Sequence, residues 1–252
     1  MISELIYSTE PINWQDLQEK VASILRVCGC DSEVECTIET ARGKVDVDVH
    51  AIDSSTSPKL TYLCECKHWG RAVPKSVVHS FRTVVSDCGA HIGFLISSNG
   101  FQSGAYEAAQ NSNIRLVNWF EFQEVFIDRW KEGRYANLKQ MLEDLFNYYD
   151  YLSAPIGNAV GGNPERLNEY VALLKRFSSQ ADANPWTRMM ESSRFPPKLP
   201  YTAIEMDADG AETELVFSEY AALYDWYEQR TQLGLNEFTK FVQRYRTGPV
   251  GM

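Results

Sequence analysis

The feature that most constrains this chain is a short run of apolar residues at positions 91–97. The run reads His-Ile-Gly-Phe-Leu-Ile-Ser, and a continuously apolar segment of this length is typical of a central strand covered on both faces. Helices can supply such cover, because each helix buries one apolar stripe against a sheet. The run therefore predicts a sheet between two layers of helices.

The neighbouring segments predict the other elements of this sheet. Helical spacing or a first-turn proline predicts helices, and alternating or apolar runs predict strands. In chain order these are a helix over 14–28, an alternating segment over 33–52, a strand over 60–67, a helix from Pro74, the strand over 91–97, a helix from Gly100, a strand over 114–117 and a helix from about Trp119. The order predicts an α/β fold, a mixed sheet flanked by helices.

The sequence pattern becomes mostly helical beyond about residue 130, so we expect two domains, 1–130 and 131–252. The second is predicted to be mostly helical with one hairpin, and its role in recognition, oligomerisation or regulation stays open. Its predicted elements are an amphipathic helix over 138–149, a loop over 153–163, a helix from Pro164, a hairpin of 202–206 with 212–217, and two helices separated near Gly234.

Composition indicates an ordinary globular protein, with 44% apolar and 23% charged residues. No apolar run is long enough to span a bilayer, and the first ten residues carry two glutamates and no basic residue, unlike a secretory signal. A cytoplasmic location without membrane contact is expected. The six cysteines lack zinc or thioredoxin spacing, so free buried thiols are expected.

The net charge of −10 argues weakly against a polyanionic partner. Residues 1–127 hold 10 Lys and Arg against 16 Asp and Glu, and residues 128–252 hold 14 against 18. Neither half is basic, so any contact with nucleic acid must come from a local patch.

Three charged residues on two successive predicted strands form the strongest chemical motif. Asp48 lies on the first strand, and Glu65 and Lys67 lie two apart on the second. Alternation places Glu65 and Lys67 on one face, where Asp48 can meet them if the strands pair. The alternative is a solvated face with a cross-strand ion pair.

These side chains suit phosphodiester hydrolysis. Asp48 and Glu65 are candidate ligands of Mg²⁺ or Mn²⁺, and the Cys66 backbone carbonyl is a plausible third ligand. Lys67 is a candidate for positioning water or for offsetting charge on the phosphorane.

The motif also carries a family resemblance. Asp-Val-His-Ala51 followed by Cys-Glu-Cys-Lys-His-Trp69 resembles the core of the PD-(D/E)xK nuclease superfamily, and in particular its Mrr-like restriction endonuclease branch. The opening helix, Ile92–Ser98 with the following Gly-Phe-Gln-Ser-Gly-Ala105, and Ile114–Val117 match further pieces in order. The resemblance covers about residues 12–127.

The resemblance implies a metal-dependent endonuclease that cuts DNA in restriction or defence, with a restriction-endonuclease-like core. Cleavage of two strands further favours a homodimer with paired sites, and a regulatory partner is left open. Asp46 is an alternative to Asp48 as the first acidic residue of the motif, because both lie on one face of the strand. Relatives often carry a helix glutamate near the metal, and the best-aligned residues here are Gln18 and Glu19.

Other residues are candidates for weaker roles. Arg71, Lys75 and Arg82 are possible phosphate contacts or simply solvated charges, and Gln102 with Ser103 lies at a helix start that suits either an anion or capping. His68 is expected to face away from Lys67, and Trp69 is expected to pack rather than to stack on a base.

Two rival functions remain. One is a nuclease fold that only binds nucleic acid or a protein partner, with its acidic face idle. The other keeps the chemistry but takes branched DNA or RNA as its substrate.

Overall fold

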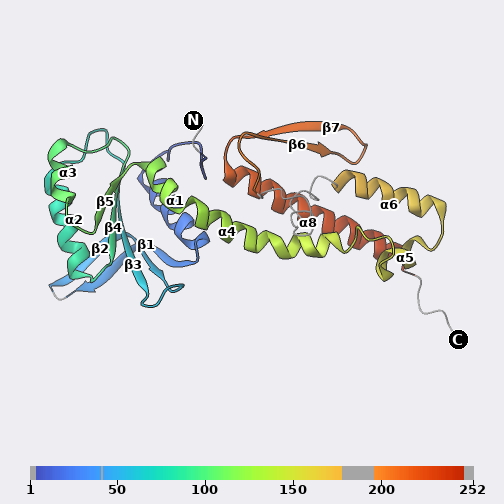
Figure 1. Cartoon of the computed structure of the whole chain (residues 1–252), viewed down its shortest axis with the longest axis horizontal. Helices are drawn as coiled ribbons and strands as arrows, with labels where there is room; N and C mark the ends of the chain where they lie inside the picture. The colour runs from blue at the N-terminus through green and yellow to red at the C-terminus, as the bar shows by residue number, and fades with distance from the viewer. Residues whose placement is uncertain (1–3, 41, 178–195, 247–252) are drawn as a thin grey trace. The chain divides into compact units, whose positions relative to one another are not determined.

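The computed structural model describes residues 4–40, 42–177 and 196–246 of the chain. These residues form two compact units (Figure 1). The N-terminal unit is Ser8–Gly133, and the C-terminal unit consists of the described parts of Arg134–Met252 and of Met1–Tyr7. Helix α4 (Trp119–Phe146) begins in the N-terminal unit and ends in the C-terminal unit, so residue 130, where we expected a boundary, lies inside a helix.

A mixed sheet is the centre of the N-terminal unit. Its described strands are β1 (Cys30–Thr40), β2 (Gly43–Asp53), β3 (Leu60–Lys67), β4 (Ile92–Ser97) and β5 (Ile114–Val117). They lie side by side in chain order; β1, β2 and β3 are antiparallel neighbours, and β3, β4 and β5 are parallel. With helices on its faces, this sheet confirms the predicted α/β class.

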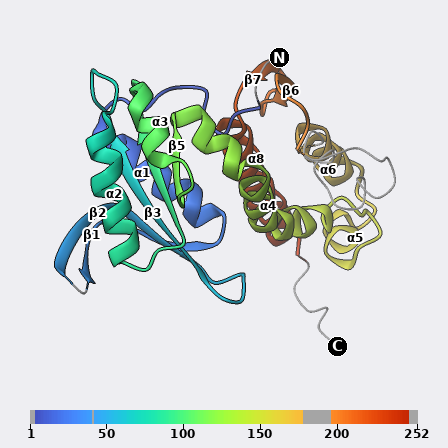
Figure 2. The same ribbon diagram turned by 60° about the vertical axis from the view of Figure 1, so that its left-hand side comes forward.

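Helices cover both faces of the sheet (Figure 2). Phe94 of β4 makes ring contacts with Phe122 and Phe126 of α4. Its neighbour Leu95 points the other way, into a cluster that includes Phe81 and Ala105. Those two residues belong to α2 (Lys75–Asp87) and α3 (Ser103–Ala109), while α1 (Trp14–Val27) lies against β1, β2 and β3. Residues 92–97 are thus the doubly covered strand that their apolar run predicts.

Gly93 of β4 gives the tightest test of this packing. A methyl group on Gly93 would lie 2.6 Å from a methyl of Val85 and 2.8 Å from a methyl of Ile114. We expect Gly93→Ala to lower the free energy of unfolding by about 1–3 kcal/mol, because the core has no room for the added carbon. Urea denaturation measures the change. Gly70→Ala is the control, since no atom lies within 4 Å of a methyl group added there, and an equal effect of both changes would contradict the packing.

The alternating segment over residues 33–52 is in fact two strands. β1 and β2 pair from Cys30↔Asp53 to Thr40↔Gly43, and Gly43 has a φ of 119°, which favours glycine. The sequence did not predict β1 as a separate strand. This strand lies at the edge of the sheet, where most of its side chains are exposed or half-buried and give no clear apolar pattern.

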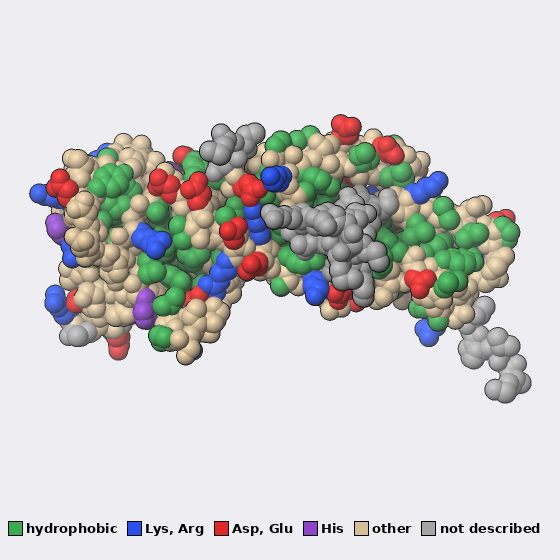
Figure 3. Space-filling view, viewed as in Figure 1, with side chains coloured by type: hydrophobic (Ala, Val, Ile, Leu, Met, Phe, Trp, Pro, Cys, Tyr) green, Lys and Arg blue, Asp and Glu red, His purple; other side chains and the backbone are tan. Residues whose placement is uncertain are grey.

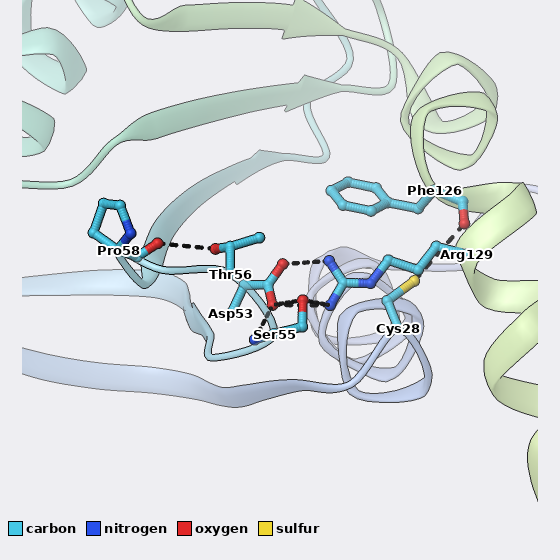
Figure 4. Close-up of polar contacts among 7 residues, drawn as sticks. All are labelled: Cys28, Asp53, Ser55, Thr56, Pro58, Phe126 and Arg129. Carbon is cyan, nitrogen blue, oxygen red and sulfur yellow. Dashed lines mark hydrogen bonds and ion pairs between the residues drawn. The ribbon is translucent and has the colours of Figure 1, made fainter.

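A buried ion pair fixes the far end of β2 to α4 (Figure 4). Arg129 donates from both terminal nitrogens to the Asp53 carboxylate, with an Nη2–Oδ1 distance of 2.9 Å. Asp53 also accepts from the backbone N–H and the hydroxyl of Ser55. The Arg129 hydrogen bonds hold the pKa of Asp53 well below its ordinary value. This cluster lies at the C-terminal end of β2, whereas Asp48 lies in the middle of the strand.

The C-terminal unit is mostly helical, as predicted. Its described elements are the end of α4, α5 (Ala154–Val160), α6 (Pro164–Phe177), β6 (Tyr201–Met206), β7 (Glu212–Phe217) and α8 (Tyr220–Tyr245). The strands β6 and β7 form the expected hairpin. An aromatic and aliphatic core joins the helices, and the N–H groups of Tyr220 and Ala221 donate to the carbonyls of Leu5 and Ile6.

Three local predictions in this region were wrong. The predicted loop over 153–163 contains α5, which begins at a first-turn proline and ends at Gly161 in the left-handed conformation. Helix α4 is continuous where we expected a second helix near residue 138. Helix α8 runs through Gly234, and this glycine lies where Leu145 and Phe177 pack closely against the helix.

The six cysteines are free, and four of them, Cys28, Cys30, Cys64 and Cys66, are buried. Burial raises the pKa of the Cys28 thiol to about 12, so this side chain stays a neutral packing group. In the described ranges, no helix has the length and apolar character needed to cross a bilayer.

Candidate active site

The pairing of β2 with β3 ends at the predicted motif. Their register runs from Asp53↔Leu60 to Val49↔Cys64, so one step further places Asp48 opposite Glu65. Beyond Val49 and Cys64, a side-chain hydrogen bond replaces the backbone pairing of the two strands. The N–H of Cys66 donates to Asp48 Oδ2 over 2.7 Å. The strands therefore separate around a carboxylate that is anchored to the neighbouring backbone.

Lys67 joins the two carboxylates. Its Nζ lies 3.9 Å from Asp48 Oδ2 and forms a close ion pair with Glu65 Oε1. The three side chains are only 16–25% exposed. The geometry that the strand alternation required, with residues 48, 65 and 67 on one side of the sheet and within reach of one another, is present.

The electrostatics of this group favour a cation. Burial raises the pKa of Glu65, and the negative charge of Asp48 raises it further, while Lys67 opposes both effects. A divalent ion between the two carboxylates would offset their repulsion, and carboxylate oxygens are the ligands that Mg²⁺ prefers. The donor set thus fits a hard cation held by few protein ligands. Among the described residues no group of three or more His, Cys, Asp or Glu side chains is arranged to hold a metal ion.

Asp46 lies on the same strand but has a different environment. It is exposed, and the Thr37 hydroxyl donates to its Oδ1 over 2.6 Å. Asp48, by contrast, accepts from Cys66 and lies within ion-pair distance of Lys67. Asp46 therefore lies at the rim of the pocket, outside the contacts that join Asp48, Glu65 and Lys67.

Two hollows meet at this rim. One, of about 610 Å³, is lined by Trp14, Gln18, Glu35, Asp46, Val47, Asp48, Cys66, Lys67, His68 and Trp69. The other, of about 340 Å³, lies against α2 and includes Glu65. Asp46 and Lys67 line both, so the motif is reachable from either side of the separated strands.

Glu35 is a carboxylate of the larger pocket that sequence reasoning missed. It lies between the pairs Val34↔Val49 and Cys36↔Val47, and hence opposite Asp48, with a φ of 51°. A glutamate in an unrecognised edge strand carries no local signal, so only the strand pairing reveals it.

The two candidates on the opening helix face in different directions. Gln18 is 4% exposed and lines the larger pocket. Glu19 is 64% exposed and lies 3.6 Å from Arg26 of the same helix. The carboxamide therefore reaches the site region, and the glutamate points away from it.

The basic candidates are dispersed. Arg71 is exposed, with its guanidinium 5.8 Å from the Trp69 ring centre, and Lys75 is exposed at the start of α2. Arg82 donates to the Ala108 carbonyl over 3.1 Å and lines a third pocket with Arg42 and His79. Figure 3, which shows one face of the molecule, has acidic and basic side chains interspersed.

Gln102 and Ser103 lie at a helix start, as predicted, since Gln102 is the N-cap residue of α3 and Ser103 is its first residue. Helix α3 has seven residues, and Gln102 makes no side-chain capping bond. Its N–H instead donates to the Val73 carbonyl, so the described contacts give this turn a backbone role.

His68 and Trp69 shape one end of the larger pocket. His68 Nε2 lies 3.1 Å from the Pro11 carbonyl, which fixes the segment before α1 against the end of β3. Trp69 is partly buried against the α2 core, as expected, and Lys67 Nζ lies 5.6 Å from its ring centre.

Comparison with known proteins adds a family to this geometry. Residues 9–126 match the model of a restriction endonuclease family, the Mrr-type catalytic domain. A crystal structure of a protein of unknown function, AF1548, aligns over 48% of this chain and 67% of its own, with 17% identity and a TM-score of 0.40. No curated protein sequence matches the chain.

Proposed function

Because residues 9–126 belong to the Mrr-type restriction endonuclease family, we propose that this protein is a metal-dependent endonuclease that hydrolyses phosphodiester bonds of DNA. The family match over residues 9–126 supports a nuclease domain in the N-terminal unit. The metal dependence, the DNA substrate and the biological role are proposed here. The observation that carries it is the convergence of Asp48, Glu65 and Lys67 where β2 and β3 separate.

Asp48 and Glu65 would hold the metal in this proposal, with the Cys66 carbonyl as a further ligand. A bound Mg²⁺ or Mn²⁺ supplies charge that polarises the scissile phosphate and lowers the pKa of a metal-bound water. The N–H of Cys66 orients Asp48, so this carboxylate is preorganised. The Lys67 ammonium lies within ion-pair distance of both carboxylates and would orient the attacking water or offset charge on the phosphorane.

The first test is nicking of supercoiled plasmid DNA. We expect the full-length protein to convert plasmid to open-circular and linear forms with Mg²⁺ or Mn²⁺ and to leave it intact with EDTA. Conversion that is equally fast in EDTA would contradict a metal-dependent reaction.

The biological role follows from the family and is likewise proposed. A cytoplasmic enzyme that cuts foreign DNA is the role we assign, and the C-terminal unit would serve recognition, dimerisation or regulation. A partner that controls activity is compatible with this arrangement.

A homodimer is the expected assembly, because one site per chain cuts one strand and double-strand cleavage needs two sites. Light scattering of the full-length protein, alone and with duplex DNA, should therefore give a mass of two chains in at least one condition. A single-chain mass in both conditions would exclude paired sites.

A further inference from the structure

Gln18 is a buried polar side chain without a partner. It is 4% exposed, and its carboxamide makes no hydrogen bond with any described residue. Gln18 lines the pocket of about 610 Å³ beside Asp48 and Lys67, and its amide atoms are not among the described side-chain atoms that are sealed from solvent without a partner. The carboxamide is therefore available to a molecule that enters this pocket.

Two tryptophans line the same pocket. Trp14, the first residue of α1, is 46% exposed although it is large and apolar. Trp69 follows β3, with cationic groups of Lys67 and Arg71 within 6 Å of its ring centre. The contact of His68 with the Pro11 carbonyl fixes the segment that leads to Trp14. The pocket thus combines indole rings with an unpaired amide, and planar rings carrying hydrogen-bonding edges suit such a lining.

We propose that this pocket binds an unpaired nucleobase next to the scissile phosphate. The inference rests on the proposed function and names the substrate class, DNA with an unpaired nucleotide. Gln18 is too deeply buried to reach a base edge inside a duplex groove, so the base must leave the stack and enter the pocket. A carboxamide both donates and accepts, as a base edge does, and an indole stacks on any base.

The carboxylates of the pocket suggest which base suits the first experiment. Glu35 and Asp46 are exposed at the pocket and only accept hydrogen bonds. Acidic side chains pair with the exocyclic amino group of cytosine. An unpaired cytosine is therefore the probe.

Binding of the full-length protein in EDTA tests the pocket without turnover. Fluorescence anisotropy compares a labelled duplex that is fully paired with the same duplex carrying one unpaired cytosine. We expect about tenfold tighter binding to the second, the size of one base–aromatic stacking contact. Trp14→Ala and Gln18→Met should abolish that preference. Tyr106→Ala, which removes an aromatic side chain of similar exposure on α3, should keep it.

The outcomes separate this inference from the proposed function. Equal affinity for both duplexes, or a preference that survives in both Trp14→Ala and Gln18→Met, overturns the base pocket. Metal-dependent nicking is measured independently. A preference without nicking supports the pocket and contradicts the nuclease, whereas nicking without a preference does the reverse.

Discussion

A Lys67→Ala variant is expected to nick supercoiled plasmid DNA at least about a hundredfold more slowly than the wild-type protein, the usual size of losing one group that stabilises transition-state charge. Lys67 lies within ion-pair distance of both Asp48 and Glu65, so alanine removes the positive charge from the centre of the site. Gel quantification of open-circular and linear plasmid against time measures the rate.

Lys44→Ala is the matched control for this loss. Lys44 lies on β2, is 71% exposed and pairs with Glu39 at 3.5 Å. Its removal takes away one lysine of the same unit and leaves the site intact. If both variants keep the wild-type rate, Lys67 has no part in the chemistry.

The Asp48→Asn variant distinguishes loss of the negative charge from loss of the fold. Asp48→Asn keeps an oxygen that can accept the Cys66 N–H and removes the negative charge, so the protein should fold and lose nicking as Lys67→Ala does. Asp46→Asn changes the exposed carboxylate bound to Thr37 and should retain most of the rate. Full activity of Asp48→Asn with loss in Asp46→Asn would exchange the roles of the two residues.

The same variants address the idle-domain alternative. If the wild-type protein, Asp48→Asn and Lys67→Ala all fail to nick plasmid but bind DNA, the fold serves binding alone. Linear duplex, four-way junction and single-stranded DNA and RNA then distinguish the substrates. Activity confined to junctions or to RNA would retain the catalytic group and change the substrate.

The alternation of side chains along the two strands was sufficient to predict most of the site. The period of two in residues 45–50 fixes the face of Asp48, and Glu65 and Lys67 share a face for the same reason. Only the antiparallel pairing of the two strands was needed to bring them together.

The missed features depend on contacts between residues far apart in the chain. Glu35 lies in an edge strand, and Gly234 lies inside a helix at a point where Leu145 and Phe177 pack closely against it. Asp53 ends β2 and accepts a hydrogen bond from Ser55, two residues further on, but its partner Arg129 is 76 residues away. No local pattern signals such a pair, because neither charge shows in the sequence which elements will bury it.

The Asp53–Arg129 ion pair should contribute strongly to the stability of the N-terminal unit. Asp53 is 1% exposed, whereas the Arg129 side chain is 32% exposed. Arg129→Met leaves a buried carboxylate without its cation and is expected to lower the free energy of unfolding by about 3–5 kcal/mol at pH 7. Asp53→Asn leaves an arginine that can turn towards water, so we expect the smaller loss of about 1–2 kcal/mol typical of a charged hydrogen bond. Urea denaturation measures both.

The stabilisation by the Asp53–Arg129 pair should depend on pH in a definite direction. Arg129 lowers the pKa of Asp53 in the folded protein, so the pair stabilises the fold above the unfolded-state pKa near 4 and loses its effect as the pH falls through the lower folded-state value. In Arg129→Met the buried carboxyl favours its protonated form instead. The difference in the free energy of unfolding between wild type and Arg129→Met should therefore become smaller from pH 7 to pH 3. Glu39→Gln, in the exposed pair with Lys44, should change stability by less than about 1 kcal/mol at pH 7. A loss in Arg129→Met no larger than that of Glu39→Gln would show that the Asp53 charge is not held in a buried environment.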